Sequence, residues 1–276
     1  MKCYLCGGEK HKKRPGSVRD NPELAINECE TCGLVFLQPD RKTNYETGEM
    51  HSGSMTLTIN QWLQLCDKDD ERRFKFLKDT VVNRDVLDFG CGPGGFLMRV
   101  KSLAKSVTGI ELESRTQPHL LDRGIKTDYE GKYDLITAFH VVEHLESPAE
   151  KLRELSKHLK PDGRLIVEVP NADDVLLTLY ESEAFSRFTY WSCHLYLFNA
   201  KTLAMLGEKA GLKVDYIKHI QRYPLSNHLY WLAKSMMGGH LEWEFLDSDF
   251  LTTAYEAQLA AIGKTDTLIA GFKHAA

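Results

Sequence analysis

The segment VLDFGCGPGGFL, residues 86–97, constrains the fold of this chain more than any other stretch, because it places four glycines within six residues. Val86 and Leu87 suit a buried strand, and Phe96 and Leu97 begin a helical spacing of apolar residues. Glycine is used where φ must be positive or where a side chain would collide with a ligand. The segment therefore predicts a strand, a turn that a ligand approaches closely, and a helix.

Strands and helices alternate along the rest of the chain. The pattern predicts strands at 85–90, 106–111, 124–127, 133–140, 164–170 and 265–273. It predicts helices at 94–104, 114–124 and 149–160, and helices interrupted near CDKDD within 61–82. The alternation of helix and strand resumes at 199–220. Such an alternation is typical of an α/β fold with a doubly wound parallel sheet.

Two stretches break this rhythm, at about 171–198 and 223–263. The first is rich in aromatic residues and the second contains amphipathic helical stretches. Ligands of open α/β sheets bind beyond the carboxyl ends of the strands, so we expect both insertions to fold there as a lid. The expected domains are 1–39, a linker with helices at 40–84, and a main domain at 85–276.

Four of the seven cysteines form two C-x-x-C pairs near the amino end. Cys3 and Cys6 form one pair, and Cys29 and Cys32 form the other. Two such pairs supply the four thiolates that a closed structural Zn²⁺ site prefers, so residues 1–39 are expected to form a zinc ribbon. A redox pair or chance spacing remains the alternative. The other cysteines are expected to be small buried hydrophobic residues.

Composition narrows the class of protein. Hydrophobic residues make up 42% of the chain and charged residues 27%, which is ordinary for a globular protein. The formal net charge of −4 disfavours a protein built mainly to bind nucleic acid or an anionic membrane. No run of apolar residues is long enough for a spanning helix, and the amino end has no signal-peptide core. We therefore expect a cytoplasmic protein.

The acidic residues around the glycine turn indicate the chemistry of its ligand. Asp88 precedes the first glycine, where its charge would repel a pyrophosphate. Glu111 ends the second strand, where a carboxylate accepts hydrogen bonds from ribose hydroxyls. An adenosine-bearing ligand with a positive charge and no phosphates fits both positions.

The segments VLDFGCGPGGFL, GIELESR, YDLITAFHVVEHLESP and LKPDGRLIVEVPN together resemble the successive motifs of class I S-adenosylmethionine-dependent methyltransferases. The resemblance covers residues 85–171 and implies a Rossmann-like sheet of seven strands whose last strand is antiparallel. It also implies that three glycines line the methionine moiety, that Asp88 supports their loop, that Glu111 holds the ribose and that Asp128 contacts the adenine. The three glycines are Gly90, Gly92 and Gly94.

The zinc ribbon, CHLYLFNAKTLAMLGEKAGLKV and YPLSNHLYWLAK resemble a branch of this family that acts on sugars, including nucleotide-sugar C-methyltransferases and enzymes of surface-polysaccharide clusters. In the C-methyltransferases a histidine in this segment is the general base, and His194 occupies that place. Cys193 stands where they have a glutamate, which favours an oxygen acceptor over a carbon one. His194 can accept a hydroxyl proton, or it can simply form a hydrogen bond within the lid.

The segment HVVEH offers a second cluster, with His140, Glu143 and His144. Quinone-biosynthesis O-methyltransferases have a similar acidic-and-histidine cluster and use a divalent cation. The alternative is that these side chains shape the pocket, with His140 as a second candidate base or acceptor contact. We therefore predict methyl transfer to a small-molecule or saccharide acceptor. A quinone-type O-methyltransferase, an RNA methyltransferase with a zinc ribbon and a non-enzymatic binding module are the alternatives.

Overall fold

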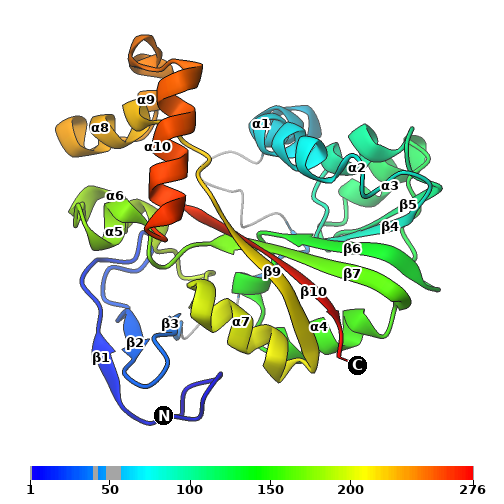
Figure 1. Ribbon diagram of the computed structural model, residues 1–276, viewed down its shortest axis with the longest axis horizontal. Coiled ribbons are helices and arrows are strands. Elements are labelled where there is room, and N and C mark those ends of the chain that lie inside the picture. The colour runs from blue at the N-terminus through cyan, green and yellow to red at the C-terminus, as the bar shows by residue number, and fades with distance from the viewer. Residues whose placement is uncertain (1, 40–42, 48–56, 276) are drawn as a thin grey trace.

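The computed structural model describes residues 2–39, 43–47 and 57–275 (Figure 1). Residues 40–42 and 48–56 of the predicted linker and helices at 40–84 lie outside the described residues. Among the residues described, no helix is both long and apolar enough to cross a membrane.

A mixed sheet of six strands forms the centre of the molecule, in the order β5-β4-β6-β7-β10-β9. The strands are β4 (Asp85–Phe89), β5 (Ser106–Ile110), β6 (Tyr133–Phe139), β7 (Leu159–Pro170), β9 (Leu212–Ile220) and β10 (Thr267–His274). Strands β5, β4, β6 and β7 are parallel, and β10 is antiparallel to both of its neighbours. The doubly wound α/β fold with an antiparallel last strand is therefore confirmed.

The predicted count of seven strands was wrong for the residues that the structure describes. The expected strand at 124–127 makes only one parallel bridge to the sheet, between Thr108 and Lys126. Its continuation, TDYEGKYD, lacks the alternating apolar side chains that a sheet edge could bury.

Helices cover both faces of this sheet, as Figure 1 shows. One face carries α1 (Ile59–Leu77), α2 (Gly95–Val100) and α3 (Thr116–Asp122), and the other carries α4 (Pro148–Ser156) and α7 (Ala200–Lys209). Phe96 of α2 and Leu120 of α3 pack with Val86 in one core cluster. Leu152 of α4 and Leu206 of α7 belong to the other. The core therefore consists of two apolar layers, one on each side of the sheet.

Helix α1 corrects the prediction that CDKDD interrupts the helical region. The helix begins with a capping box between Thr58 and Gln61 and runs through this acidic stretch without a break. Asp69 pairs with Arg72 at 3.0 Å and Asp70 with Arg73 at 3.2 Å, each three residues apart. These pairs stabilise the helix through the acidic stretch, where the spacing of apolar residues lapses.

The amino-terminal residues form a second sheet, in the order β1-β2-β3-β8. Its strands are β1 (His11–Lys13), β2 (Asn27–Cys29), β3 (Val35–Phe36) and β8 (Tyr196–Leu197). β8 comes from the first insertion, and its Leu197 lies opposite Val35. The cysteine-bearing segment is thus tied directly to the main domain.

The two insertions pack against each other beside the carboxyl ends of β7 and β9. The first contains α5 (Val175–Thr178) and α6 (Glu183–Thr189), and the second contains α8 (Leu225–Lys234), α9 (Gly239–Glu242), the 3₁₀ helix η3 (Glu244–Leu246) and α10 (Asp249–Ala261). Val175 and Leu176 join Trp231 and Leu259 in one buried cluster. Figure 1 shows α8, α9 and α10 projecting from the rest of the molecule.

Candidate functional site

The glycine turn between β4 and α2 adopts the left-handed backbone conformation that its sequence predicts. Gly90, Gly92 and Gly94 have φ values of +74°, +53° and +80°. A Cβ atom on Gly90 would lie 2.3 Å from Val141 Cγ2, and one on Gly92 would lie 3.0 Å from the Trp62 ring. These positions therefore require glycine for both conformation and space.

Glu111 lies against this turn from the carboxyl end of β5. One carboxylate oxygen accepts a hydrogen bond from the backbone N–H of Gly92 at 2.9 Å. The other accepts from the N–H groups of Leu112 at 2.7 Å and Glu113 at 3.1 Å. Glu111 is therefore held in a fixed orientation at the pocket wall, and it also supports the turn.

Asp88 is 3% exposed on β4, directly before the turn. The Thr137 hydroxyl donates a hydrogen bond to its carboxylate at 2.7 Å. Burial raises the pKa of Asp88 to about 7, although the Thr137 hydrogen bond opposes this shift.

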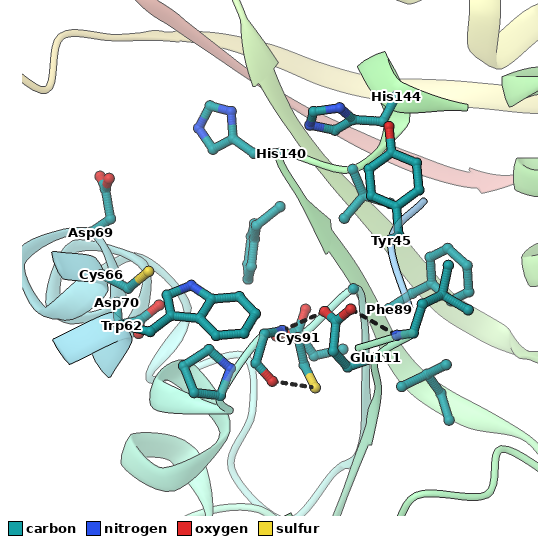
Figure 2. Close-up of a pocket in the computed structure, with 18 of the residues that line it drawn as sticks. Tyr45, Trp62, Cys66, Asp69, Asp70, Phe89, Cys91, Glu111, His140 and His144 are labelled. Carbon is teal, nitrogen blue, oxygen red and sulfur yellow. Dashed lines mark hydrogen bonds between the residues drawn. The ribbon is translucent and has the colours of Figure 1, made fainter. Parts of the chain in front are cut away.

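A pocket of about 320 Å³ joins these groups to the carboxyl ends of β4, β5 and β6. Figure 2 shows Glu111, Cys91 and Trp62 toward one end, and His140 and His144 toward the other. The described lining residues include none from either insertion, so the expected lid does not form the pocket wall directly. Helix α1 supplies part of that wall instead, through Trp62, Leu65, Cys66, Asp69, Asp70 and Arg73.

Asp128 is not brought into this pocket. It is exposed in the irregular segment after the Lys126 bridge and is not among the lining residues described. An adenine contact by Asp128 remains a prediction from the resemblance.

His140 stands at the carboxyl end of β6 with a φ of +53°. Its Nδ1 lies 3.2 Å from a carboxylate oxygen of Glu143, and its Nε2 lies 3.2 Å from one of Glu168. Burial alone would lower the pKa of His140, but the hydrogen bonds to these two carboxylates outweigh it and raise the pKa. Both nitrogens are therefore engaged, and the charged form is favoured.

Glu168 on β7 is fully buried and joins His140 to helix α1. It accepts hydrogen bonds from Arg72 at 2.9 Å and Arg73 at 2.7 Å. Burial alone would raise its pKa, but Arg73 and the other cations hold it well below the usual range. This buried charge network was missed by the sequence analysis. The sequence signal for this network was the adjacent pair Arg72 and Arg73 shortly after two aspartates. That signal does not identify their partner Glu168, which is distant in sequence.

His144 lines the pocket from the 3₁₀ helix η2 (Val142–His144), with His194 next to it. The two imidazole rings are 4.8 Å apart between centroids. His144 Nδ1 donates a hydrogen bond to the Cys193 carbonyl at 3.0 Å, because a carbonyl can only accept. Nε2 of His144 is therefore the nitrogen that carries the lone pair.

His194, the predicted base, does not line the pocket in the described residues but lies behind His144. Burial and the neighbouring His144 lower the pKa of His194 to about 3. Burial also lowers the pKa of His144, although Glu143 opposes the shift. Both imidazoles are therefore neutral near pH 7.

The four cysteines of the two C-x-x-C pairs converge in the amino-terminal part of the chain. Their sulfur atoms all lie within 4.8 Å of one another. Cys3 and Cys32 sulfurs are 3.6 Å apart, as are those of Cys6 and Cys29. A tetrahedron with Zn–S bonds of about 2.3 Å has sulfur–sulfur edges of about 3.8 Å, so this geometry fits a zinc ion.

Comparisons with known proteins agree with this fold. A relative from Burkholderia pseudomallei named ubiquinone biosynthesis O-methyltransferase is 29% identical over 166 residues, covering 53% of this chain and 72% of the relative. A Thermotoga maritima structure described as a SAM-dependent methyltransferase, possibly a histamine N-methyltransferase, has a TM-score of 0.51 at 18% identity and covers 78% of this chain and 94% of its own.

Coclaurine N-methyltransferase, solved with N-methylheliamine and SAH, has a TM-score of 0.52 at 14% identity, covering 85% of this chain and 84% of its own. At such identities the two structures show the fold alone. The family described as a methyltransferase domain matches residues 62–217, which is more than half of the chain. The chain therefore belongs to this methyltransferase-domain family and is an S-adenosylmethionine-dependent methyltransferase.

Proposed function

We propose that this protein transfers the methyl group of S-adenosylmethionine to a hydroxyl group of a small-molecule acceptor, most specifically a saccharide. The observation that carries the proposal is the pocket itself, which joins the glycine turn to His144. Gly90, Gly92 and Glu111 form its donor end, and His140 and His144 form its acceptor end.

At the donor end, the turn approaches the methionine part of the cofactor and Glu111 holds the ribose. Asp88 acts mainly through the turn, because its carboxylate is buried and hydrogen-bonded to Thr137. The SAH in the coclaurine N-methyltransferase structure is consistent with a ligand of this class.

At the acceptor end, His144 is the group placed to receive a proton. The acceptor oxygen forms a bond to the methyl carbon, and the carbon–sulfur bond breaks with its electron pair left on sulfur. The hydroxyl proton passes to Nε2 of His144, which is available because Nδ1 donates to Cys193. His140 is less suited to this step, since both its nitrogens contact carboxylates.

The saccharide proposal is supported by the sequence resemblance and by a few charged side chains in a pocket wall that is otherwise mainly apolar. Asp69, Asp70 and Arg73 line it beside His140 and offer both hydrogen-bond donors and acceptors. Such groups suit a polyhydroxylated acceptor. A phenolic acceptor is the second candidate, because relatives are named ubiquinone biosynthesis O-methyltransferases.

The converging cysteines also support a structural zinc ion in the ribbon. All four ligands come from the protein, which leaves no open position for chemistry. The expected role of this ion is to fold residues 1–39 and to hold β3 against β8.

Incubation with methyl-labelled S-adenosylmethionine and a panel of acceptors tests the proposal. The panel contains nucleotide sugars, glycans, phenolic quinone precursors and RNA. We expect label in a nucleotide sugar or glycan. Label only in a phenol would favour the second candidate, and label only in RNA would contradict a small-molecule acceptor.

A further inference from the structure

The first insertion places two further donor side chains beside His144. The sulfur of Cys193 and one ring nitrogen each of His144 and His194 all lie within 4.8 Å of one another. Cys193 is 3% exposed. The sequence analysis considered a cation at His140, Glu143 and His144 instead, but those donor atoms do not converge in the described part of the chain.

The hydrogen bonds explain why Cys193 and His194, rather than His140 and Glu143, are available to bind a metal ion together with His144. Both ring nitrogens of His140 contact carboxylates, at 3.2 Å each. By contrast, Nδ1 of His194 is buried and has no hydrogen-bond partner among the residues described. A buried nitrogen without a partner costs free energy unless something occupies its lone pair or takes its proton.

The surroundings of the three side chains resemble the support that metal ligands receive. His144 Nδ1 donates to the Cys193 carbonyl, which fixes the ring and leaves Nε2 as a donor atom. One carboxylate oxygen of Glu143 is buried without a hydrogen-bond partner, and Glu143 interacts electrostatically with both His144 and His194. A cation among these ligands would be balanced by that charge.

We propose that His144, Cys193 and His194 form a second zinc site, separate from the four-cysteine cluster and adjoining the pocket at His144. Two imidazoles and one thiolate are ligands that Zn²⁺ favours, and three protein ligands leave a fourth position for water or substrate. Ligand atoms of a tetrahedral zinc ion are about 3.4–3.8 Å apart. The three donor atoms lie within 4.8 Å of one another, so they must approach by at most about 1.4 Å to close the site.

The site adjoins the place where the acceptor hydroxyl is expected, because His144 lines the pocket. The ring of Tyr45 packs against the His144 ring, with 5.8 Å between the ring centroids. Figure 2 shows Tyr45 and His144 together at this end of the pocket. A zinc ion there would lower the pKa of a bound hydroxyl, so that its proton would pass to solvent rather than to Nε2 of His144. Only this catalytic role of the zinc ion rests on the proposed function, because zinc binding itself is measured in the absence of an acceptor.

Metal content of the purified protein tests the proposal. We expect Cys193→Ser and His194→Gln each to contain about one zinc ion per chain less than the wild type. Cys66→Ser is the matched control, because Cys66 also lines the pocket but lies on α1, and it should retain the wild-type content. Binding of SAH to each variant verifies that the main domain is folded.

Replacement of the metal by Co²⁺ distinguishes the two sites. The intensity of the thiolate-to-cobalt charge-transfer absorption should fall slightly in Cys193→Ser and strongly in Cys6→Ser. The reason is that the second site holds one thiolate and the four-cysteine cluster holds four. Equal zinc content in the wild type, Cys193→Ser and His194→Gln would overturn the proposal. A protein that binds the second zinc but methylates no hydroxyl would contradict the proposed function alone.

Discussion

Glu111 accepts hydrogen bonds from three backbone N–H groups, including that of Gly92 in the glycine turn. Replacement by alanine removes the proposed ribose contact and one support of the turn. We predict that Glu111→Ala weakens SAH binding by about 1–3 kcal/mol, the range for hydrogen bonds to a charged group. Calorimetric titration measures this, with exposed Asp122→Ala on α3 as the control. Equal affinities for the two variants would place the ribose elsewhere.

His144 lines the proposed acceptor end of the pocket, and His194 lies next to it. We predict that either His144→Asn or His194→Asn lowers turnover ~10²- to 10⁴-fold while SAH affinity stays near the wild-type value. The two roles proposed for this pair, proton acceptor and metal ligand, both require the imidazoles for chemistry and not for binding the donor. Single-turnover assays with labelled donor measure the effect.

The control for this pair is His158→Asn. His158 directly precedes β7, its ring contacts the Gly131 carbonyl, and it is not among the described residues that line the pocket. His158→Asn should leave turnover unchanged. Near-normal turnover in both His144→Asn and His194→Asn would mean that neither histidine takes part in deprotonation.

At the scale of elements, His140 joins β6 to the carboxylates of η2 and β7. The pKa of His140 is raised in the folded protein, so protonated His140 stabilises the fold fully at pH values below its unfolded-state pKa of about 6.5. This contribution is lost as the pH rises through the folded-state pKa of His140. We predict that the difference in melting temperature between the wild type and His140→Asn is larger at about pH 5.5 than at about pH 8.5.

Asparagine is the chosen replacement because it tolerates the positive φ of this position. Glu143, Glu168 and Arg222 are the charged groups that contact or influence His140. Glu143→Gln, which removes one carboxylate partner, should reduce the same pH dependence. A difference that grows with pH would show that His140 is neutral in the folded protein.

The amino-terminal sheet contacts the main domain by pairing β3 with β8, which follows Cys193 and His194 closely in sequence. Loss of the proposed ribbon zinc should therefore loosen the segment that carries these two residues. We predict that Cys6→Ser lowers zinc content and melting temperature, and speeds hydrogen exchange in residues 190–198. Cys66→Ser is the control. Unchanged exchange in 190–198 after loss of the ribbon metal would contradict this coupling.

These elements also show what the sequence can predict. The glycine turn and the two C-x-x-C pairs are local patterns, so their conformation and convergence follow from spacing. The contacts of Val35 with Leu197 and of Arg73 with Glu168 join distant segments, and no local pattern identifies the partner. For the same reason, the position of His144 in front of His194 became visible only in the folded structure.

At the scale of the whole molecule, the doubly wound α/β fold followed from the alternation of strands and helices, and the antiparallel last strand followed from the resemblance to class I methyltransferases. The strand count did not, because a strand at 124–127 needs apolar residues that its continuation lacks. Both insertions lie beside the carboxyl ends of β7 and β9, and their role as a lid stays a prediction. The insertions bury their apolar residues against each other, as Val175 and Trp231 do, so α1 forms the pocket wall instead.

The atom that receives the methyl group tests the account most directly. Reaction with ¹³C-methyl S-adenosylmethionine and the acceptor found in the panel, followed by proton–carbon correlation NMR of the product, identifies that atom by the chemical shift of the new methyl group. The account predicts a methoxy signal on a saccharide, absent when His144 is replaced by asparagine. A label in a carbon-bound or nitrogen-bound methyl group would contradict it.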